Sequence, residues 1–434
     1  MCNSNISPSG GRGLISRDQN HLWHPYTQHK TAAPPIAIKR GEGALLWDEN
    51  GKEYIDAIAS WWVNPYGHSN TFIADAIYKQ LTTLEHVLFG GFTHEPAIIL
   101  AEKLIEILPK KQQKIFFSDN GSTAVEVAIK VALQYFFNKG EKKTTIIAFE
   151  NAFHGDTFAA MATSGISFFT EAFQGMFIDV VRIPVPIKGR EETSFNALAE
   201  AIKNNNCAGF IFEPLVQGAA GMVMYEPEAL DNLLQICQEN KVLTIADEVM
   251  TGFGKTGKTF ACDYLFEKPD MMCLSKALTG GTIPMAITTF TQEIFEAFYD
   301  EDINKALFHG HTFTANPTGC AAALASLSLL QTPEMQNNIT RINKSHLHFQ
   351  KHIESHPKVA TTRVLGVIFA LEIKTESATS YYGKLRNQLY DFFIENGVIL
   401  RPVGNIVYIL PPYIITDEQL QKVYGLVEKV LEIV

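Results

Sequence analysis

The stretch KVLTIADEVMTGFGKTGKTFACDYLFEKPDMMCLSKALTGG, residues 241–281, decides the fold. It contains two short apolar runs, KVLTIA and DMMCLS, and each run is followed by an ionisable residue, Asp247 or Lys276. A continuous apolar run of this length is typical of a β-strand buried on both faces of a sheet. Open α/β sheets bind ligands at the carboxyl ends of their strands. The stretch therefore predicts a buried sheet with a carboxylate and an amine at its ligand-binding edge.

Similar runs recur on both sides of this stretch: KIFFSD (114–119), TTIIAFE (144–150), VVRIPVP (180–186), CAGFIFEP (207–214) and PMAITTF (284–290). Between several of them lie segments with helical periodicity, such as 122–137, where apolar residues recur every three or four positions. Strands that alternate with helices predict a mainly parallel α/β sheet.

The two ends of the chain have a different pattern. The first 64 residues contain the strand-like pieces PIAIKR, GALLWD and EYIDAIA. Towards the other end we expect a strand at 364–373, a helix near 382–395 that stops at Gly397, the runs VILRP and NIVYILPP, and a final helix from Thr416 with a capping box to Gln419. We therefore expect a small α+β domain assembled from 1–64 and 336–434, and a large domain at 65–335.

Composition narrows the function classes. The 434 residues are 46% hydrophobic and 19% charged, which is ordinary for a globular chain and unlike a disordered one. Lys and Arg number 36 against 46 Asp and Glu, and no block of like charges indicates nucleic-acid or membrane binding. The six cysteines lack metal-ligand spacing, so we expect free thiols and no metal. Neither a signal peptide nor an apolar run of ~18 residues is present, which favours a cytoplasmic protein.

Lys276 and Asp247 suggest chemistry at the strand ends. A charged lysine at a buried strand end is costly unless it is paired or its pKa is lowered, and both conditions suit an amine that forms a Schiff base. A lysine that reaches solvent along its apolar stem remains an alternative. Asp247 would need a partner, for which a protonated pyridine nitrogen, Lys276 or a backbone amide are candidates.

The third feature is the sequence Asn-Gly-Ser-Thr at 120–123, between a predicted strand and a predicted helix. Free backbone N–H groups at a helix start can bind a phosphate, although a simple helix cap is the commoner use of such residues. An amine, a carboxylate and a phosphate site together match the three functional groups of pyridoxal 5′-phosphate. A nucleotide-binding dehydrogenase is a weaker alternative, because the glycines at 252–254 do not complete GxGxxG.

The sequence also resembles a known family. The segments FFSDNGSTAVEVAIK, FHGDTFAAM, FIFEPLVQGAAGM, ADEVMTGFGKTGKTFAC, LSKALTGG and HGHTFTANPTGCAAA are similar to the successive motifs of the class III, fold type I aminotransferases. LWHPYTQ, the pair Trp61-Trp62 and VILRPVGNIVYILPPY resemble those members that convert 8-amino-7-oxononanoate into 7,8-diaminononanoate in biotin biosynthesis. The resemblance implies a fold type I transferase with a seven-stranded sheet flanked by helices, pyridoxal 5′-phosphate as cofactor, and a homodimer with composite active sites.

The resemblance also implies roles for individual residues. Lys276 is similar to the lysine that forms the Schiff base and moves the proton, and Asp247 to the carboxylate that keeps the pyridine nitrogen protonated. Phe153 takes the place of the aromatic residue that stacks on the cofactor ring, with core packing as its alternative. Thr312 resembles the threonine that reaches the phosphate from the neighbouring subunit. The phosphate loop would be Gly121 and Ser122.

Arg401 stands between an apolar strand and a proline, where a guanidinium can hold a carboxylate through paired hydrogen bonds. The resemblance places the substrate carboxylate there and implies that the slot is shaped by Tyr26, Trp61 and Trp62, with Asp156 near the substrate amino group. Without the resemblance, Arg401 would be a surface ion pair and the tryptophans core residues. Tyr408 is a further candidate for the cavity, and Glu213 and Gln217 either support the cofactor from behind or have a purely structural role.

Three residues depart from the enterobacterial members of this group, which have Tyr, Arg and Pro in place of Phe153, Lys255 and His311. Phe153 keeps a ring for stacking but loses a hydroxyl, and Lys255 keeps a charge but loses the planar fork of arginine. S-adenosylmethionine is the expected amino donor and lysine the second candidate. Two alternatives remain for the whole chain: another class III enzyme acting on ornithine, 4-aminobutyrate or a general ω-amino acid, and a cofactor-binding regulatory protein without turnover.

Overall fold

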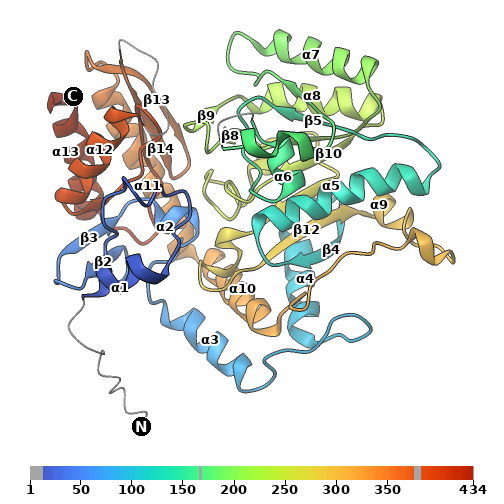
Figure 1. Cartoon of the computed structure of the whole chain (residues 1–434), viewed down its shortest axis with the longest axis horizontal. Coiled ribbons are helices and arrows are strands. Elements are labelled where there is room, and N and C mark those ends of the chain that lie inside the picture. Colours follow the sequence, from blue (N-terminus) through green and yellow to red (C-terminus); the bar gives the residue numbers. More distant parts are fainter. Residues whose placement is uncertain (1–12, 166–168, 376–382, 434) are drawn as a thin grey trace.

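The computed structural model in Figure 1 describes residues 13–165, 169–375 and 383–433. Its centre is a seven-stranded sheet with the strand order β4-β12-β11-β10-β7-β5-β6. β12 runs antiparallel to both of its neighbours, and the other adjacent pairs are parallel. The strands are β4 (Gln112–Ser118), β5 (Thr145–Phe149), β6 (Val180–Ile183), β7 (Cys207–Phe212), β10 (Leu243–Asp247), β11 (Met271–Leu274) and β12 (Ala286–Thr291). The seven predicted strands and the mainly parallel α/β fold are confirmed.

Side chains of the central strands alternate between two apolar layers. Ile146 and Ala148 of β5 pack in one cluster with helix α5 (Gly121–Asn138), whereas Ile147 and Phe149 pack in the other. The second cluster includes side chains of α7 (Glu191–Asn204) and α8 (Pro227–Glu239). Both faces of the sheet are therefore covered, which explains why the strands read as continuous apolar runs.

The other helices are α1 (Leu14–His21), α2 (Ala59–Trp62), α3 (Thr71–Leu81), α4 (Glu95–Ile107), α6 (Phe158–Thr163), α9 (Gln292–Glu296), α10 (Pro317–Leu330), α11 (Pro333–Ile353), α12 (Lys384–Glu395) and α13 (Asp417–Ile433). Short 3₁₀ helices are η1 (Glu171–Met176), η2 (Ala261–Tyr264), η3 (Lys276–Thr279) and η4 (Ile303–Lys305). Within the described part of the chain, no helix is long and apolar enough to cross a membrane.

Both ends of the chain contribute to one sheet, as Figure 1 shows where blue and red segments lie side by side. Its order is β1-β2-β3-β15, and the C-terminal strand β15 pairs in parallel with the N-terminal strand β3. The strands are β1 (Ile38–Glu42), β2 (Leu45–Asp48), β3 (Glu53–Asp56) and β15 (Val398–Ile399). The predicted small α+β part therefore draws on both termini, while the residue boundaries 1–64, 65–335 and 336–434 stay a prediction.

The segment 364–373 differs from the prediction of a single strand. It forms a tight hairpin between β13 (Val359–Leu365) and β14 (Ile368–Ile373), and β14 pairs further with β16 (Ile406–Ile409). Gly366 turns the chain with φ +59°, and a Cβ there would lie 2.2 Å from the carbonyl carbon of Thr256. The chain reverses at this glycine because only glycine fits both the positive φ and the close approach. A small hairpin, β8 (Val216–Gln217) and β9 (Val223–Met224), completes the strands.

Two predicted helix ends are confirmed. Gly397 has φ +73° just beyond α12. The N–H of Gln419 donates to Thr416 Oγ1 at 3.2 Å, and the N–H of Thr416 donates to Gln419 Oε1 at 3.0 Å, which is the reciprocal pattern of a capping box. The five cysteines in the described residues are free and buried, as expected, and Cys2 lies outside those residues.

Candidate active site

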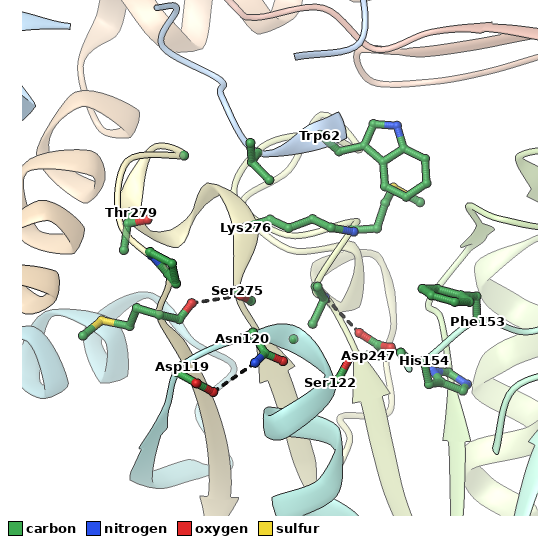
Figure 2. A pocket seen from close by; sticks show the side chains of 18 of the residues that line it. Trp62, Asp119, Asn120, Ser122, Phe153, His154, Asp247, Ser275, Lys276 and Thr279 are labelled. Carbon is green, nitrogen blue, oxygen red and sulfur yellow. Dashed lines mark hydrogen bonds and ion pairs between the residues drawn. The ribbon is translucent and has the colours of Figure 1, made fainter. Parts of the chain in front are cut away.

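A cavity of about 500 Å³ opens at the carboxyl ends of the central strands. Figure 2 shows how several predicted site residues surround one space. The cavity is lined by Lys276, Asp247, Gly121, Ser122, Phe153 and Trp62, and also by His154 and Glu213. These residues come from different strand ends, so the sheet brings together groups that lie far apart in sequence.

The start of α5 faces the cavity with its backbone. Asn120 and Thr123 form the helix cap: the N–H of Thr123 donates to Asn120 Oδ1, and the N–H of Asn120 donates to Thr123 Oγ1, both at 3.1 Å. The N–H groups in the first turn of a helix have no partner within the helix, and the helix dipole favours an anion beside them. This end of α5 can therefore hold a phosphate group.

Glycine is required beside this helix start. A Cβ on Gly121 would lie 2.7 Å from Val249 Cγ1. Gly155 has φ +131°, and a Cβ there would lie 2.1 Å from Ser122 Oγ. The next residue, Asp156, donates its N–H to the same Ser122 oxygen at 3.2 Å. The missing side chains allow two loops to close around the helix start and leave room for a ligand.

Lys276 is separated from β11 by Ser275 alone and begins η3 with φ +49°, a conformation that is uncommon outside glycine. Its Nζ lies 4.5 Å from the centre of the Trp62 ring. Burial lowers the pKa of Lys276 to about 8, against the opposite effect of the Asp247 and Glu213 charges. A substantial fraction of this amine is neutral near pH 8, which is the nucleophilic form.

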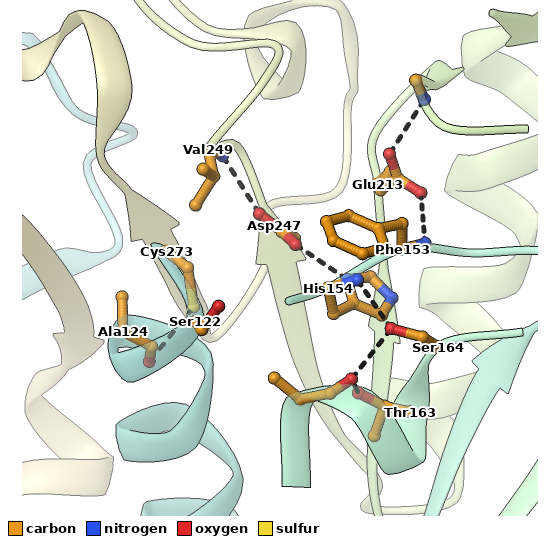
Figure 3. A network of polar contacts seen from close by, with 12 residues as sticks. Ser122, Ala124, Phe153, His154, Thr163, Ser164, Glu213, Asp247, Val249 and Cys273 are labelled. Carbon is orange, nitrogen blue, oxygen red and sulfur yellow. Dashed lines mark hydrogen bonds and ion pairs between the residues drawn. The ribbon is translucent and has the colours of Figure 1, made fainter. Parts of the chain in front are cut away.

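Asp247 at the end of β10 is paired with His154, as Figure 3 shows. His154 Nδ1 lies 2.7 Å from Asp247 Oδ2, and the N–H of Val249 donates to Asp247 Oδ1 at 3.1 Å. Both side chains are buried. The sequence assigns no role to His154, although its position in FHGD, five residues beyond the end of β5, places it near the edge of the sheet. Its pairing with Asp247 depends on the fold.

Glu213 at the end of β7 holds two loops together. Its carboxylate accepts the N–H of Phe153 at 3.0 Å and the N–H of Gly218 at 2.9 Å. Burial raises the pKa of Glu213 to about 7. The neighbouring Gln217 is also buried and donates to the carbonyl of Glu150 at 3.2 Å. Both side chains thus fix backbone around Phe153, whose ring remains 40% exposed at the cavity.

The residues predicted to form a substrate slot are also brought together. The Tyr26 hydroxyl hydrogen-bonds to Asp156, and the Tyr26 ring meets the Trp61 ring edge-on at 5.8 Å between centres. The guanidinium of Arg401 lies over Trp61 at 4.3 Å from the ring centre. Tyr408 is buried and packs against Trp62 at 6.0 Å, so it backs the slot and does not line the cavity.

The two tryptophans stand on an unusual piece of backbone. Ala59, Ser60, Trp61 and Trp62 have φ values of 46°, 46°, 70° and 71°, so α2 is a single turn of left-handed helix. The turn is closed by hydrogen bonds from Trp62 N–H to the Ile58 carbonyl at 2.8 Å and from Val63 N–H to the Ala59 carbonyl at 2.9 Å. Left-handed helical backbone costs L-residues ~1–2 kcal/mol each.

Of the predicted slot residues, only Trp62 lines the cavity, and Thr312, Lys255 and His311 do not line it either. Thr312 is exposed and does not line it. Lys255 is fully buried, and its Nζ donates to the Gly252 carbonyl at 3.1 Å. Burial, together with the Lys276 charge, lowers the pKa of Lys255 to about 7. His311 accepts the N–H of Phe313 at 3.2 Å through Nδ1.

Comparison with known proteins gives consistent matches over nearly the whole chain. The family model Aminotransferase class-III matches residues 26–431. The chain is 43% identical over 420 residues to an adenosylmethionine-8-amino-7-oxononanoate aminotransferase of Synechococcus elongatus, covering 95% of this chain and 98% of the relative. A relative of the same name from Geobacter sulfurreducens is 37% identical, with 95% and 96% covered.

Solved structures agree with these matches. The adenosylmethionine-8-amino-7-oxononanoate aminotransferase of Methanocaldococcus jannaschii superposes with a TM-score of 0.91 at 34% identity, over 96% of this chain and 98% of that one. An omega transaminase of Pseudomonas jessenii in complex with PMP gives a TM-score of 0.89 at 28% identity, over 97% and 98%.

Proposed function

The chain belongs to the class III aminotransferases, and we propose that it transfers an amino group to the 7-keto carbon of 8-amino-7-oxononanoate, giving 7,8-diaminononanoate for biotin biosynthesis. The observation that carries this proposal is the 43% identity to an adenosylmethionine-8-amino-7-oxononanoate aminotransferase over 95% of the chain. The enzyme is a transaminase that depends on pyridoxal 5′-phosphate, in keeping with its family and with a structural relative in complex with PMP.

The residues around the cavity fit this cofactor. The backbone N–H groups of Gly121 and Ser122 would bind its phosphate, and Asp247 would accept a hydrogen bond from its protonated ring nitrogen. Phe153 would cover one face of the ring, and Lys276 would hold the cofactor covalently through Nζ. When bound, pyridoxal 5′-phosphate supplies an electron sink that stabilises negative charge at the substrate carbon.

Lys276 and Asp247 carry the chemistry that the chain itself provides. Lys276 Nζ takes a proton from the carbon that bears the donor amino group and returns a proton to the acceptor carbon, because a pKa of about 8 lets it act in both directions near neutral pH. The Asp247 carboxylate would face the ring nitrogen. His154 at 2.7 Å orients that carboxylate and offsets the cost of its burial.

The substrate slot selects the acceptor. Arg401 would bind the terminal carboxylate of 8-amino-7-oxononanoate with paired hydrogen bonds. Trp61 and Trp62 would flank its apolar chain, and Tyr26 with Asp156 would lie near its amino group. A positive charge at one end of the slot and a carboxylate at the other match the two ends of this amino acid.

S-adenosylmethionine is the proposed amino donor, with lysine as the second candidate. Several relatives carry adenosylmethionine in their names. Lys255 donates to a backbone carbonyl, so its contacts do not favour either donor. The donor half-reaction separates the candidates: the holoenzyme is mixed with each donor alone, and conversion of its absorbance from the pyridoxal to the pyridoxamine form is followed.

We further propose that the working enzyme is a cytoplasmic homodimer with composite sites. Thr312 is exposed and lies away from the cavity of its own chain, in a segment that also exposes Phe308 and Phe313. An exposed apolar segment is suited to an interface, and a second copy would bring Thr312 to the phosphate end of the neighbouring cavity. Light scattering measures whether the protein is a dimer. Thr312→Ala should weaken cofactor binding and leave the dimer intact.

Complementation tests the proposed reaction in a cell. A bacterial strain that lacks this amination step grows without biotin only if 7,8-diaminononanoate is supplied. Expression of the chain should remove that requirement, and expression of the Lys276→Ala variant should not. A different outcome is that the strain still requires 7,8-diaminononanoate while the purified enzyme transfers an amino group from ornithine or 4-aminobutyrate to 2-oxoglutarate. That pair of results would assign the chain to another class III activity.

A further inference from the structure

The turn Ala59–Trp62 carries both tryptophans of the substrate slot in a conformation that L-residues avoid. All four residues have positive φ, and none of them is glycine. Single residues in this region occur at functional sites, but a complete left-handed turn persists only when surrounding groups determine it. The turn must therefore be held by contacts from outside its own sequence.

The carboxylate of Asp56, at the end of β3, makes these contacts. Its Oδ1 accepts the N–H of Ser60 at 3.0 Å and its Oδ2 accepts the Ser60 hydroxyl at 2.7 Å. The N–H of Ile58 also points to Oδ1, at 3.3 Å. Asp56 is completely buried. A buried carboxylate that binds two groups of one residue fixes the backbone of that residue and leaves its own charge in need of a partner.

His68 is that partner. Its Nε2 lies 2.9 Å from Asp56 Oδ2, and its Nδ1 lies 3.0 Å from the amide nitrogen of Asn64. An amide nitrogen can only donate, so Nδ1 accepts and Nε2 carries the hydrogen that His68 donates to Asp56. β1 passes close to His68, because a Cβ at Gly41 would lie 2.7 Å from His68 Cβ. Asn64 thus donates to His68, and His68 and Ser60 both donate to Asp56, so these hydrogen bonds converge on the carboxylate that binds the turn.

The turn determines where both rings lie. Trp62 packs against the backbone of Gly218, where a Cβ would lie 3.2 Å from Trp62 Cη2, and it faces Lys276 Nζ at 4.5 Å. Trp61, the preceding residue, points instead to Arg401. A right-handed turn would direct the two side chains differently, since side-chain direction follows the backbone helix sense. One strained turn therefore places the Trp62 ring beside the Lys276 amine and the Trp61 ring beside the Arg401 guanidinium.

We propose that Asp56 and His68 are positioning residues of the substrate slot, which hold α2 left-handed and so keep Trp61 and Trp62 in register with Lys276 and Arg401. The role of the slot in binding the acceptor rests on the proposed function, whereas the holding of the turn does not. Neither residue lines the cavity, and the start of α5 and Asp247 lie on other elements. Loss of the pair should therefore impair acceptor binding and leave cofactor binding intact.

Matched variants of His68 and Asp56 test this role. His68→Leu removes the donor to Asp56, and His68→Gln keeps an N–H donor. Asp56→Asn keeps the shape but replaces one acceptor oxygen by a donor. Ala59→Gly, added to Asp56→Asn, lowers the cost of positive φ and removes only one methyl group. His352→Leu is the control, because it deletes a histidine that pairs with Glu428 at 3.0 Å on the protein surface.

Two readouts are taken on each holoenzyme: the KM for 8-amino-7-oxononanoate, and quenching of tryptophan fluorescence by acrylamide. We expect His68→Leu and Asp56→Asn to raise KM at least about tenfold and to increase quenching, with cofactor affinity unchanged. His68→Gln and the Ala59→Gly double variant should recover most of both losses, and the control should match wild type. If Asp56→Asn does not fold, the two His68 variants decide.

The proposal is overturned if His68→Leu leaves both KM and quenching at the wild-type values. It is equally overturned if cofactor affinity falls while KM rises and neither His68→Gln nor Ala59→Gly restores the cofactor affinity or the KM. That pattern indicates a general loss of packing. If wild type itself does not use 8-amino-7-oxononanoate, the proposed function fails, and the quenching series with its Ala59→Gly recovery still decides whether the pair holds the turn.

Discussion

The cavity has a cofactor wall at the strand ends, and the substrate slot beside it has a wall made of segments from the two ends of the chain, of which Trp62 also lines the cavity. The cofactor wall, made of Gly121, Ser122, Asp247 and Lys276, is supported by the central sheet and by the first turn of a long helix. The slot wall, made of Tyr26, Trp61, Trp62 and Arg401, rests on short segments and a left-handed turn. The proposed catalytic residues thus lie on regular structure, whereas the proposed acceptor-binding residues lie on structure that must be held by contacts from outside.

The largest expected effect is on the cofactor wall. Lys276→Ala should lower kcat by about 10⁴-fold, because it removes the group proposed to move the proton. The loss should be equal for every donor and acceptor, since the proposed role belongs to both halves of the reaction. Single-turnover product formation measures it. Retained turnover in a purified variant would show that another group carries the proton.

Asp247→Asn should lower kcat by about 10²- to 10³-fold, again with all substrates alike. The amide cannot hold a positive charge on the ring nitrogen, and it leaves His154 without a charged partner. The measurement is kcat with two unrelated acceptors. A loss of kcat with only one acceptor would contradict a role in cofactor binding and would indicate that Asp247 acts in acceptor recognition.

The pH dependence of cofactor capture tests the environment of Lys276. Its pKa is lowered to about 8, so its neutral fraction rises as pH rises through 8. The rate at which cofactor-free protein binds pyridoxal 5′-phosphate covalently should increase about 50-fold between pH 6 and pH 8 and then level off. Stopped-flow absorbance follows the reaction. A rate that keeps rising up to pH 10 would indicate an ordinary exposed lysine.

The smallest effect, and the most selective, is expected on the slot wall. Arg401→Lys keeps the charge but loses the planar fork, so KM for 8-amino-7-oxononanoate should rise about tenfold with little change in kcat. The donor half-reaction with S-adenosylmethionine serves as the internal control. An equal loss in both halves would mean that Arg401 belongs to a shared binding site, and the distinction between the two walls would fail.

The same contrast explains what could be predicted from the sequence. The seven strands were found because a strand buried on both faces leaves a local apolar run, and Lys276 and Asp247 because they directly follow such runs. The helix start at Gly121 has an equally local signature. These features depend on residues close together in sequence.

Other features could not be predicted because they depend on distant contacts. The left-handed turn at Ala59–Trp62 contains no glycine that would indicate positive φ, and it is imposed by Asp56 and His68. The pairing of His154 with Asp247 joins residues 93 positions apart. The hydrogen bond from Lys255 to the Gly252 carbonyl also depends on the fold. The hairpin at Gly366 is the exception, since a glycine within an apolar run could have indicated the turn.

The most direct test of the account is a single turnover of the acceptor half-reaction. Purified enzyme in the pyridoxamine 5′-phosphate form is mixed with 8-amino-7-oxononanoate in the absence of any donor, quenched, and examined by mass spectrometry. The account predicts one equivalent of 7,8-diaminononanoate per active site, and none from the Lys276→Ala variant. Absence of the diamine from wild type, while 2-oxoglutarate is converted to glutamate under the same conditions, would contradict it.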